Sequence, residues 1–255
     1  MNILDIQPNF WLYWFTFCGI IIGRYFITAG GIYWLLQVIL NKRFLSSQFK
    51  DIHQRRAAIA ADIKLSTGSA IFFALSAACF MSCYSRGFTR VYTDWEIQDL
   101  GYLAFSYVVV LLLQDTYFYF VHRLFHLPML FKWFHQGHHQ SKTPTPWTSF
   151  AFDPLEAAIQ ASFLFCITLV IPLHFWVLIL LLLTMTVWAV GNHLGVQVVP
   201  SSRVSRWWGQ WCIGSGHHLV HHRRYTRHYG LYFTFWDRLL GTQDAGYELK
   251  RLKSS

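Results

Sequence analysis

Long apolar runs alternate with short charged segments along the chain. The runs cover residues 10–40, 65–84, 100–121 and 155–192. About 20 apolar residues are enough to cross the hydrocarbon core of a bilayer, so each run is a candidate membrane helix. The first run predicts one long tilted helix, or a helix followed by an interfacial segment. Pro172 divides the last run into the two halves of a predicted helical hairpin.

The charged residues between the runs predict the orientation of these spans. Six basic residues stand against two acidic ones in segment 41–64, and nine against three in segment 193–255. Lys and Arg are enriched in cytoplasmic segments, so both segments are expected in the cytoplasm, together with segment 122–153. Segment 85–99 holds two basic and three acidic residues and is expected on the opposite side. The pattern predicts an all-α integral membrane protein with about four transmembrane helices, or three spans plus the helical hairpin.

The composition supports a membrane protein built as a single domain over residues 1–255. Apolar residues make up 54% of the chain and charged residues 13%, against about 25% charged in an average soluble domain. The formal net charge is +9, but the basic residues lie beside apolar runs. That pattern is typical of contact with anionic lipid and does not indicate a nucleic acid partner. Segment 203–213, which carries Trp207, Trp208 and Trp211, is expected to form an amphipathic helix at the membrane surface.

Histidines carry the candidate chemistry. The chain has 13 of them, and most fall into four groups just after predicted spans. These are His122 and His126; His135, His138 and His139; His193; and His217, His218, His221 and His222. Residues three and four apart share a helix face, so each group with that spacing is expected to point its imidazoles together. Eight or more nitrogen ligands exceed what one ion can bind, which predicts two metal ions.

Alternative roles for the histidines fit less well. His53 and His174 stand alone and are expected to be structural or exposed. A zinc protease is disfavoured because no box carries the glutamate of the HExxH motif. Haem binding would need single histidines well inside paired spans, and a cation transporter would want ionisable groups near the middle of the bilayer. Only Asp115 approaches that description, and it is expected instead to orient an imidazole through its free N–H.

The ligand type leaves several metals open. Imidazole suits zinc, iron, copper and nickel. Zinc has no redox chemistry, and the sequence contains no serine-hydrolase motif, P-loop or dinucleotide-binding fingerprint. A site at the end of membrane helices with no acyl or phosphoryl machinery favours a pair of iron ions that activates O2.

The histidine boxes resemble those of the fatty acid hydroxylase/sterol desaturase superfamily, and the chain is similar to its bacterial sterol desaturase-like members. HRLFH (122–126), HQGHH (135–139) and HLVHH (218–222) match the superfamily pattern in order and spacing. Asp115, the Asn192-His193 pair, Tyr229-Gly230 and segment 236–242 support the match. The resemblance covers residues 100–243, and residues 1–99 are expected to be a membrane anchor. His228 departs from the usual asparagine and is not expected to be a ligand.

The resemblance implies a transmembrane anchor under a cytosolic helical cap that holds two irons. The eight box histidines carry over as ligands, followed by His193 and His217. The implied reaction is O2-dependent hydroxylation or desaturation of an unactivated C–H bond in a membrane lipid, such as a sterol or fatty acyl chain. Ether-lipid cleavage and carotenoid hydroxylation on the same scaffold remain alternatives, as does a metal-binding membrane transporter that is not an enzyme.

The resemblance also implies an electron donor. The sequence has no cytochrome b5-like domain, no ferredoxin cysteine pattern and no flavin or nicotinamide fingerprint. A separate donor, of ferredoxin type or of cytochrome b5 type with its reductase, is therefore expected to dock on the basic cytosolic face. The compact length favours a bacterial inner membrane over the endoplasmic reticulum.

Overall fold

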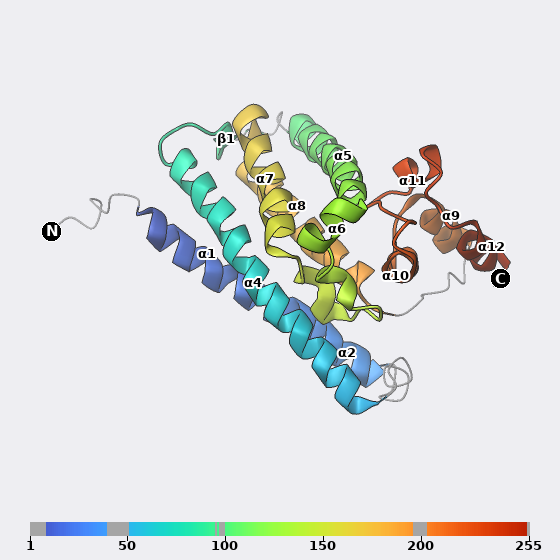
Figure 1. Cartoon of the computed structure of the whole chain (residues 1–255). Coiled ribbons are helices and arrows are strands. Elements are labelled where there is room, and N and C mark those ends of the chain that lie inside the picture. Colours follow the sequence, from blue (N-terminus) through green and yellow to red (C-terminus); the bar gives the residue numbers. More distant parts are fainter. Residues whose placement is uncertain (1–8, 40–50, 95, 97–99, 196–202, 254–255) are drawn as a thin grey trace.

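A computed structural model describes residues 9–39, 51–94, 96, 100–195 and 203–253 (Figure 1). The first apolar run is one continuous helical span of 30 residues, Phe10–Ile39. It consists of α1 (Phe10–Tyr25), the π-helical turn η2 (Phe26–Gly30) and α2 (Gly31–Ile39). At the π-helical turn, the Thr28 hydroxyl donates to the Arg24 carbonyl at 2.8 Å. The structure therefore has the single long helix and not the helix followed by a separate interfacial segment.

The second membrane helix is longer than the sequence predicted. Helix α4 (Ile52–Tyr84) has 33 residues, so residues 52–64 are helical and do not belong to a loop. Asp51 starts the helix, because its carboxylate accepts a hydrogen bond from the Gln54 amide at 2.8 Å. Further along, buried Ala70 and Ala74 of α4 pack against Ile21 of α1. Small residues at this contact let two membrane helices approach closely.

The remaining apolar runs form α5 and the predicted hairpin. Helix α5 is Leu100–Phe125, and the hairpin consists of α7 (Pro154–Val170) and α8 (Phe175–Asn192). Two short parallel strands, β1 (Val91–Tyr92) and β2 (Leu173–His174), pair at the hairpin turn. The described residues contain four helices long and apolar enough to span a bilayer, while α7 is a shorter apolar helix. The expectation of an all-α membrane protein with about four spans is confirmed.

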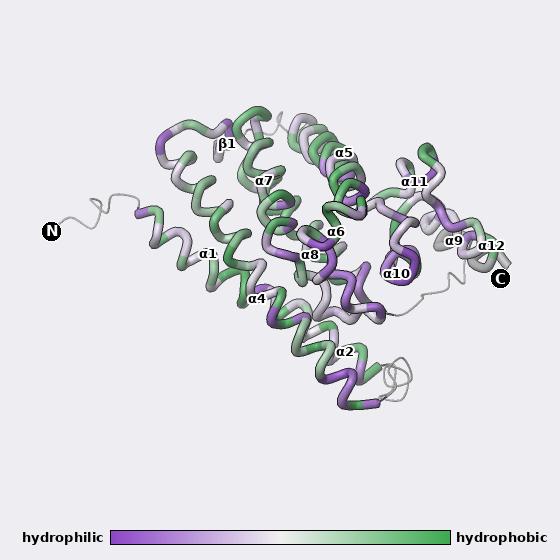
Figure 2. Tube along the Cα trace, in the orientation of Figure 1, coloured by the Kyte–Doolittle hydropathy of each residue, from purple (hydrophilic) through white to green (hydrophobic). Residues whose placement is uncertain are grey.

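Short helices gather at one end of the membrane helices and form a cap (Figure 1). Their bounds are α6 (Pro128–Phe134), η4 (His138–Gln140), η5 (Pro146–Phe150), α9 (Arg203–Trp211), α10 (Ser215–Arg224), α11 (Phe235–Leu239) and α12 (Ala245–Lys253). Figure 2 shows that α10 is hydrophilic, in contrast to the apolar stretches of α5, α7 and α8. The cap and the end of α5 hold all three histidine boxes, and His193 follows the last residue of α8.

A buried carboxylate ties the cap to the membrane helices. Asp62 of α4 is almost fully buried and accepts hydrogen bonds from the hydroxyls of Ser141, at 2.5 Å, and Thr148, at 2.7 Å. Ser69 of α4 also donates to the Phe150 carbonyl at 2.7 Å. These bonds fix segment 141–150 directly after the second histidine box.

We expect Asp62→Ala to destabilise the protein more than Asp51→Ala does. The first change leaves two buried hydroxyls without an acceptor and should lower the free energy of unfolding by about 2 kcal/mol or more. The second removes an exposed helix cap and should cost about 1 kcal/mol or less. Unfolding in mixed detergent micelles titrated with SDS measures both values. Equal losses would contradict a stabilising role of Asp62 beyond that of a helix cap.

Candidate metal centre

The histidine boxes lie where regular helices end. His122 and His126 occupy the last turn of α5 and the residue after it. His135 is the C-cap of α6, and His138 and His139 form the short 3-10 turn η4. The second box is therefore not one helix face, as its spacing suggested. The third box lies within α10, and His193 caps the C-terminus of α8.

The imidazoles converge as two groups, whose ligand atoms lie within 4.8 Å of one another in each group. The five-histidine group contains His122, His126, His135, His139 and His221. The four-histidine group contains His138, His193, His218 and His222. All nine are buried except His126, which is half-buried.

The second and third boxes are divided between the two groups. Residues four apart stay together, as His135 and His139 do in one group and His218 and His222 in the other. Residues three apart belong to different groups: His135 lies in the five-histidine group and His138 in the four-histidine group. The expectation that each box would point its imidazoles together is wrong for these two boxes. The second and third boxes therefore each contribute histidines to both groups, so the same two short segments connect the groups.

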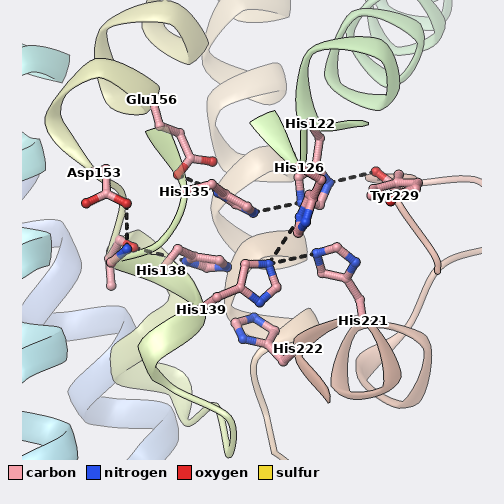
Figure 3. Close-up of polar contacts among 12 residues, drawn as sticks. His122, His126, His135, His138, His139, Asp153, Glu156, His221, His222 and Tyr229 are labelled. Atoms are coloured by element: carbon pink, nitrogen blue, oxygen red, sulfur yellow. Dashed lines mark hydrogen bonds and ion pairs between the residues drawn. The ribbon is translucent and has the colours of Figure 1, made fainter. Parts of the chain in front are cut away.

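Hydrogen bonding fixes the tautomers of His122 and His135 in the five-histidine group. His122 donates from Nδ1 to the Tyr229 carbonyl at 2.9 Å, and His135 Nδ1 lies 2.8 Å from the Glu156 carboxylate (Figure 3). Both Nδ1 atoms face acceptors, so the proton sits on Nδ1 and leaves the Nε2 lone pair free. Yet the two Nε2 atoms lie only 2.9 Å apart. Two lone pairs at that distance repel, and a cation between them would turn the repulsion into attraction.

The four-histidine group has the same arrangement. His193 donates from Nδ1 to the Ala189 carbonyl at 2.7 Å, and His138 donates to the Ala151 carbonyl at 3.0 Å. Their Nε2 atoms are 3.5 Å apart, and His218 Nε2 lies 2.9 Å from His193 Nε2. Both groups thus fit a metal ion by the chemistry and direction of their donor atoms.

Burial keeps these imidazoles in the neutral form that binds metal. It lowers the pKa of His138 to about 4 and the pKa of His193 to about 3. The pKa of His221 lies well below its usual value, first because of burial and then because of the neighbouring His122 and His126. Since metal ligands must be deprotonated, the groups are ready for a metal at neutral pH.

Glu156 is the site residue that the sequence interpretation missed. Its side chain is fully buried in the first turn of α7, with one oxygen on His135 and the other, Oε1, without a hydrogen-bond partner. A carboxylate behind a metal-binding imidazole orients the ring and makes it a stronger ligand. The available signal was an acidic residue inside an apolar run, where an unpaired charge is costly.

Asp115 does not have the predicted role. Its carboxylate accepts hydrogen bonds from the backbone amides of Tyr232 and Phe233, at 2.7 and 3.1 Å. No imidazole of the described chain is among its hydrogen-bond partners. It therefore orients a loop of the cap and not a histidine, because the segment after α10 folds back onto α5.

The remaining histidines lie outside both groups. His217 pairs through Nε2 with Glu248 of α12 at 3.1 Å and accepts through Nδ1 from the Gly214 amide. It precedes His218 and so points about 100° away around α10. His228 accepts from the Asp244 amide at 3.1 Å, His174 caps α8, and His53 is exposed.

A small cavity touches both groups on the side of the membrane helices. Its volume is about 40 Å³, enough for a few water-sized molecules. Phe118 of α5, Ala189 of α8 and Leu231 of the cap line it together with Phe152 and Glu156. The cavity therefore places an apolar wall and one carboxylate beside the imidazoles.

Comparison with known proteins gives a consistent picture. The sequence model of the family described as fatty acid hydroxylase matches residues 107–242. The chain is 34% identical to lathosterol oxidase of Rattus norvegicus over 159 residues, which is 62% of this chain and 52% of that protein. It is 28% identical to a Delta(7)-sterol 5(6)-desaturase of Gibberella zeae over 160 residues, 63% of this chain and 48% of that protein. The chain spans about half the length of these relatives, and no solved structure matches it.

We expect His193→Ala to reduce bound metal from about two ions to about one per chain, because His193 belongs to the four-histidine group only. His217→Ala should retain both ions, since its ring faces Glu248. Elemental analysis of protein purified from iron-supplemented cells measures the difference. Loss of iron on His217→Ala would restore the prediction that His217 is a ligand.

We further expect Glu156→Leu to weaken metal binding about 10- to 100-fold, the effect typical of losing a carboxylate behind a metal-bound imidazole. Competition with a coloured chelator measures the affinity. Asp244→Asn is the matched control, because it also removes a buried carboxylate, but one that pairs with Arg224 and contacts no imidazole of the two groups. If the control weakened metal binding as much as Glu156→Leu, a general loss of packing would explain both results.

Proposed function

The chain belongs to the fatty acid hydroxylase family, and from that premise we propose that it is an oxidoreductase that uses O2 to hydroxylate or desaturate a C–H bond of a membrane lipid. One observation carries the proposal. Two groups of neutral, buried imidazoles converge at the end of helices long and apolar enough to span a bilayer. Nitrogen-rich sites of this kind suit a redox metal, and their position suits a substrate dissolved in lipid.

We propose iron as the metal of both groups. A pair of iron ions held there would supply the redox chemistry that activates O2. The residues of the chain hold the metals, orient the rings through fixed Nδ1 contacts and shield the site from water. Glu156 lines the cavity and has one oxygen without a hydrogen-bond partner, so it can also bind a water molecule or hydroxyl group there.

The cavity supports entry of the substrate from the bilayer. Phe118 and Ala189 belong to α5 and α8, so the apolar wall is built by the membrane helices themselves. The small volume fits O2 and the reacting carbon, while the bulk of a lipid would remain among the helices. Hydroxylation replaces one hydrogen by OH, whereas desaturation removes a second hydrogen from the adjacent carbon. The choice between them depends on how these two carbons are held.

A sterol is the substrate class that we favour. The names of the relatives describe a lathosterol oxidase and Delta(7)-sterol desaturases, and a fatty acyl chain is the second candidate. The match covers the residues that build both histidine groups and the cavity, which supports a shared reaction type more strongly than a shared lipid.

We also propose a separate electron donor, of ferredoxin or cytochrome b5 type. Oxidation of one C–H bond supplies only half of the electrons that reduce O2 to water, so a reductant is required. Exposed Arg223 and Arg227 lie beside the five-histidine group, where His221 donates to the Arg227 carbonyl at 2.7 Å. An acidic carrier would complement this basic surface. We place this basic surface in the cytoplasm because Lys and Arg are enriched in the same segments of the chain. The preference for a bacterial inner membrane stays a prediction.

The proposal is tested with the full chain in lipid nanodiscs that contain a sterol or a phospholipid, supplied with a ferredoxin or cytochrome b5 and its reductase. We expect O2 consumption and a lipid product heavier by one oxygen or lighter by two hydrogens. His138→Ala should lower the rate by roughly 100-fold or more, because it removes a metal ligand. The exposed His53→Ala is the matched control and should keep full activity.

The alternative of a metal transporter has a different signature. It would bind metal reversibly and move it across the wall of a sealed vesicle without changing any lipid. Metal uptake by vesicles, together with unchanged lipid masses under every donor, would reject the proposed oxidation.

A further inference from the structure

The segment that follows the third histidine box reaches far along α5. Tyr232 and Phe233 donate to Asp115, and the Trp236 indole donates to the Thr116 hydroxyl at 3.1 Å. Asp115 and Thr116 lie about two and a half turns before the end of α5, roughly 14 Å along its axis at 1.5 Å per residue. The segment therefore lies beside the apolar part of α5 and not only at its histidine end.

The non-helical backbone of this segment has its polar groups paired by protein. Besides the two amides on Asp115, the Tyr232 carbonyl accepts from the Ile213 amide at 2.8 Å, and the Thr234 amide donates to the Trp211 carbonyl at 2.9 Å. The Tyr232 hydroxyl donates to Gln114 of α5 at 2.9 Å. Irregular backbone is tolerated at membrane depth only when it is satisfied in this way.

The outer surface of the same segment is apolar. Phe235 is 54% exposed and Leu239 is 62% exposed, both on α11. Figure 2 shows the hydrophobic colour at the α11 turn, next to α5. The exposed Phe120 of α5 adjoins it through Trp236, with ring centroids 5.0 Å apart. The apolar surface of the membrane helix thus continues onto the cap.

Helix α9 adds residues typical of a membrane interface. Trp207, Trp208 and Trp211 are all exposed, and the Arg238 guanidinium lies over the Trp211 ring at 4.5 Å. Tryptophan and arginine are enriched where acyl chains meet headgroups. By contrast, Arg223 in the last turn of α10 and Arg227 in the loop after it are both exposed. The cap thus has an apolar surface on α9 and α11 and a basic surface elsewhere.

We propose that residues 229–240 form a re-entrant element that inserts into the bilayer beside α5. Phe235 and Leu239 contact acyl chains, the α9 tryptophans lie at the level of the headgroups, and Arg227 stays in water. Gly230 and Leu231 of the element line the cavity, so lipid would reach the cavity wall. The lipid contact itself does not depend on the proposed reaction.

Photo-crosslinking in phospholipid vesicles tests the insertion. The photoreactive residue p-benzoylphenylalanine is introduced in place of Phe235, Leu239, Leu113 or Arg227 in the full chain. Leu113 is an exposed residue of α5 within the span and serves as the positive control, and Arg227 is the negative control. We expect lipid adducts at 235 and 239 at a yield close to that at 113 and about tenfold above that at 227. Yields at 235 and 239 equal to that at 227 would overturn the proposal.

A second measurement uses the unaltered protein, so that a folding defect cannot decide the outcome. Vesicles are prepared with a phospholipid that carries a diazirine on its acyl chain, and labelled peptides are identified by mass spectrometry after illumination. Labelling within 229–240 supports insertion. Labelling of α1 and α5 together with an unlabelled 229–240 peptide rejects it.

Discussion

The structure depends on a set of nitrogen lone pairs that face one another without protons between them. His122 and His135 each commit Nδ1 to an acceptor, so their Nε2 atoms, 2.9 Å apart, cannot both be satisfied by hydrogen bonding. The same conflict recurs between His138 and His193. Nine imidazoles are gathered in the two groups. Burying so many imidazole nitrogens without partners is energetically unfavourable in a dry interior. Cations bound between the nitrogens of each group would offset this cost.

The acceptors that create this condition come from separate parts of the chain. Backbone carbonyls of Ala151, Ala189, Arg227 and Tyr229 receive Nδ1 protons, and Glu156 receives the one from His135. Backbone acceptors fix a ring without adding charge, whereas Glu156 adds a negative charge behind a single ligand. The two groups are therefore not equivalent, and a metal held by the five-histidine group would have the more electron-rich environment.

The sequence was informative where local spacing decides the outcome. The spans and the convergence of the histidine boxes could be predicted, because apolar length and residue spacing are local properties. His193 stands alone in the sequence and joins the four-histidine group through the packing of α8. The division of the second box could not be predicted, since α6 ends at His135 and the turn that follows sends His138 the other way. Glu156 and Asp115 depend on partners 21 and 117 residues away. Which buried acid serves an imidazole is decided by tertiary packing, and the sequence pattern favoured the wrong one.

Asp115 nevertheless affects the five-histidine group indirectly, through the segment that it anchors. It anchors Tyr232 and Phe233, while Asp237 accepts from the amides of Tyr229 and Gly230, each at 2.9 Å. The segment held between these two carboxylates provides the Tyr229 carbonyl on which the His122 tautomer depends, and Arg227 just before it does the same for His221. The apolar surface of α11 belongs to that segment as well. Contact between this segment and lipid is thus connected, through a few short hydrogen bonds, to the orientation of two imidazoles in the five-histidine group. The proposed oxidation of a membrane lipid needs this segment to be held firmly, because an element that borders the lipid must not disturb the geometry of the histidines.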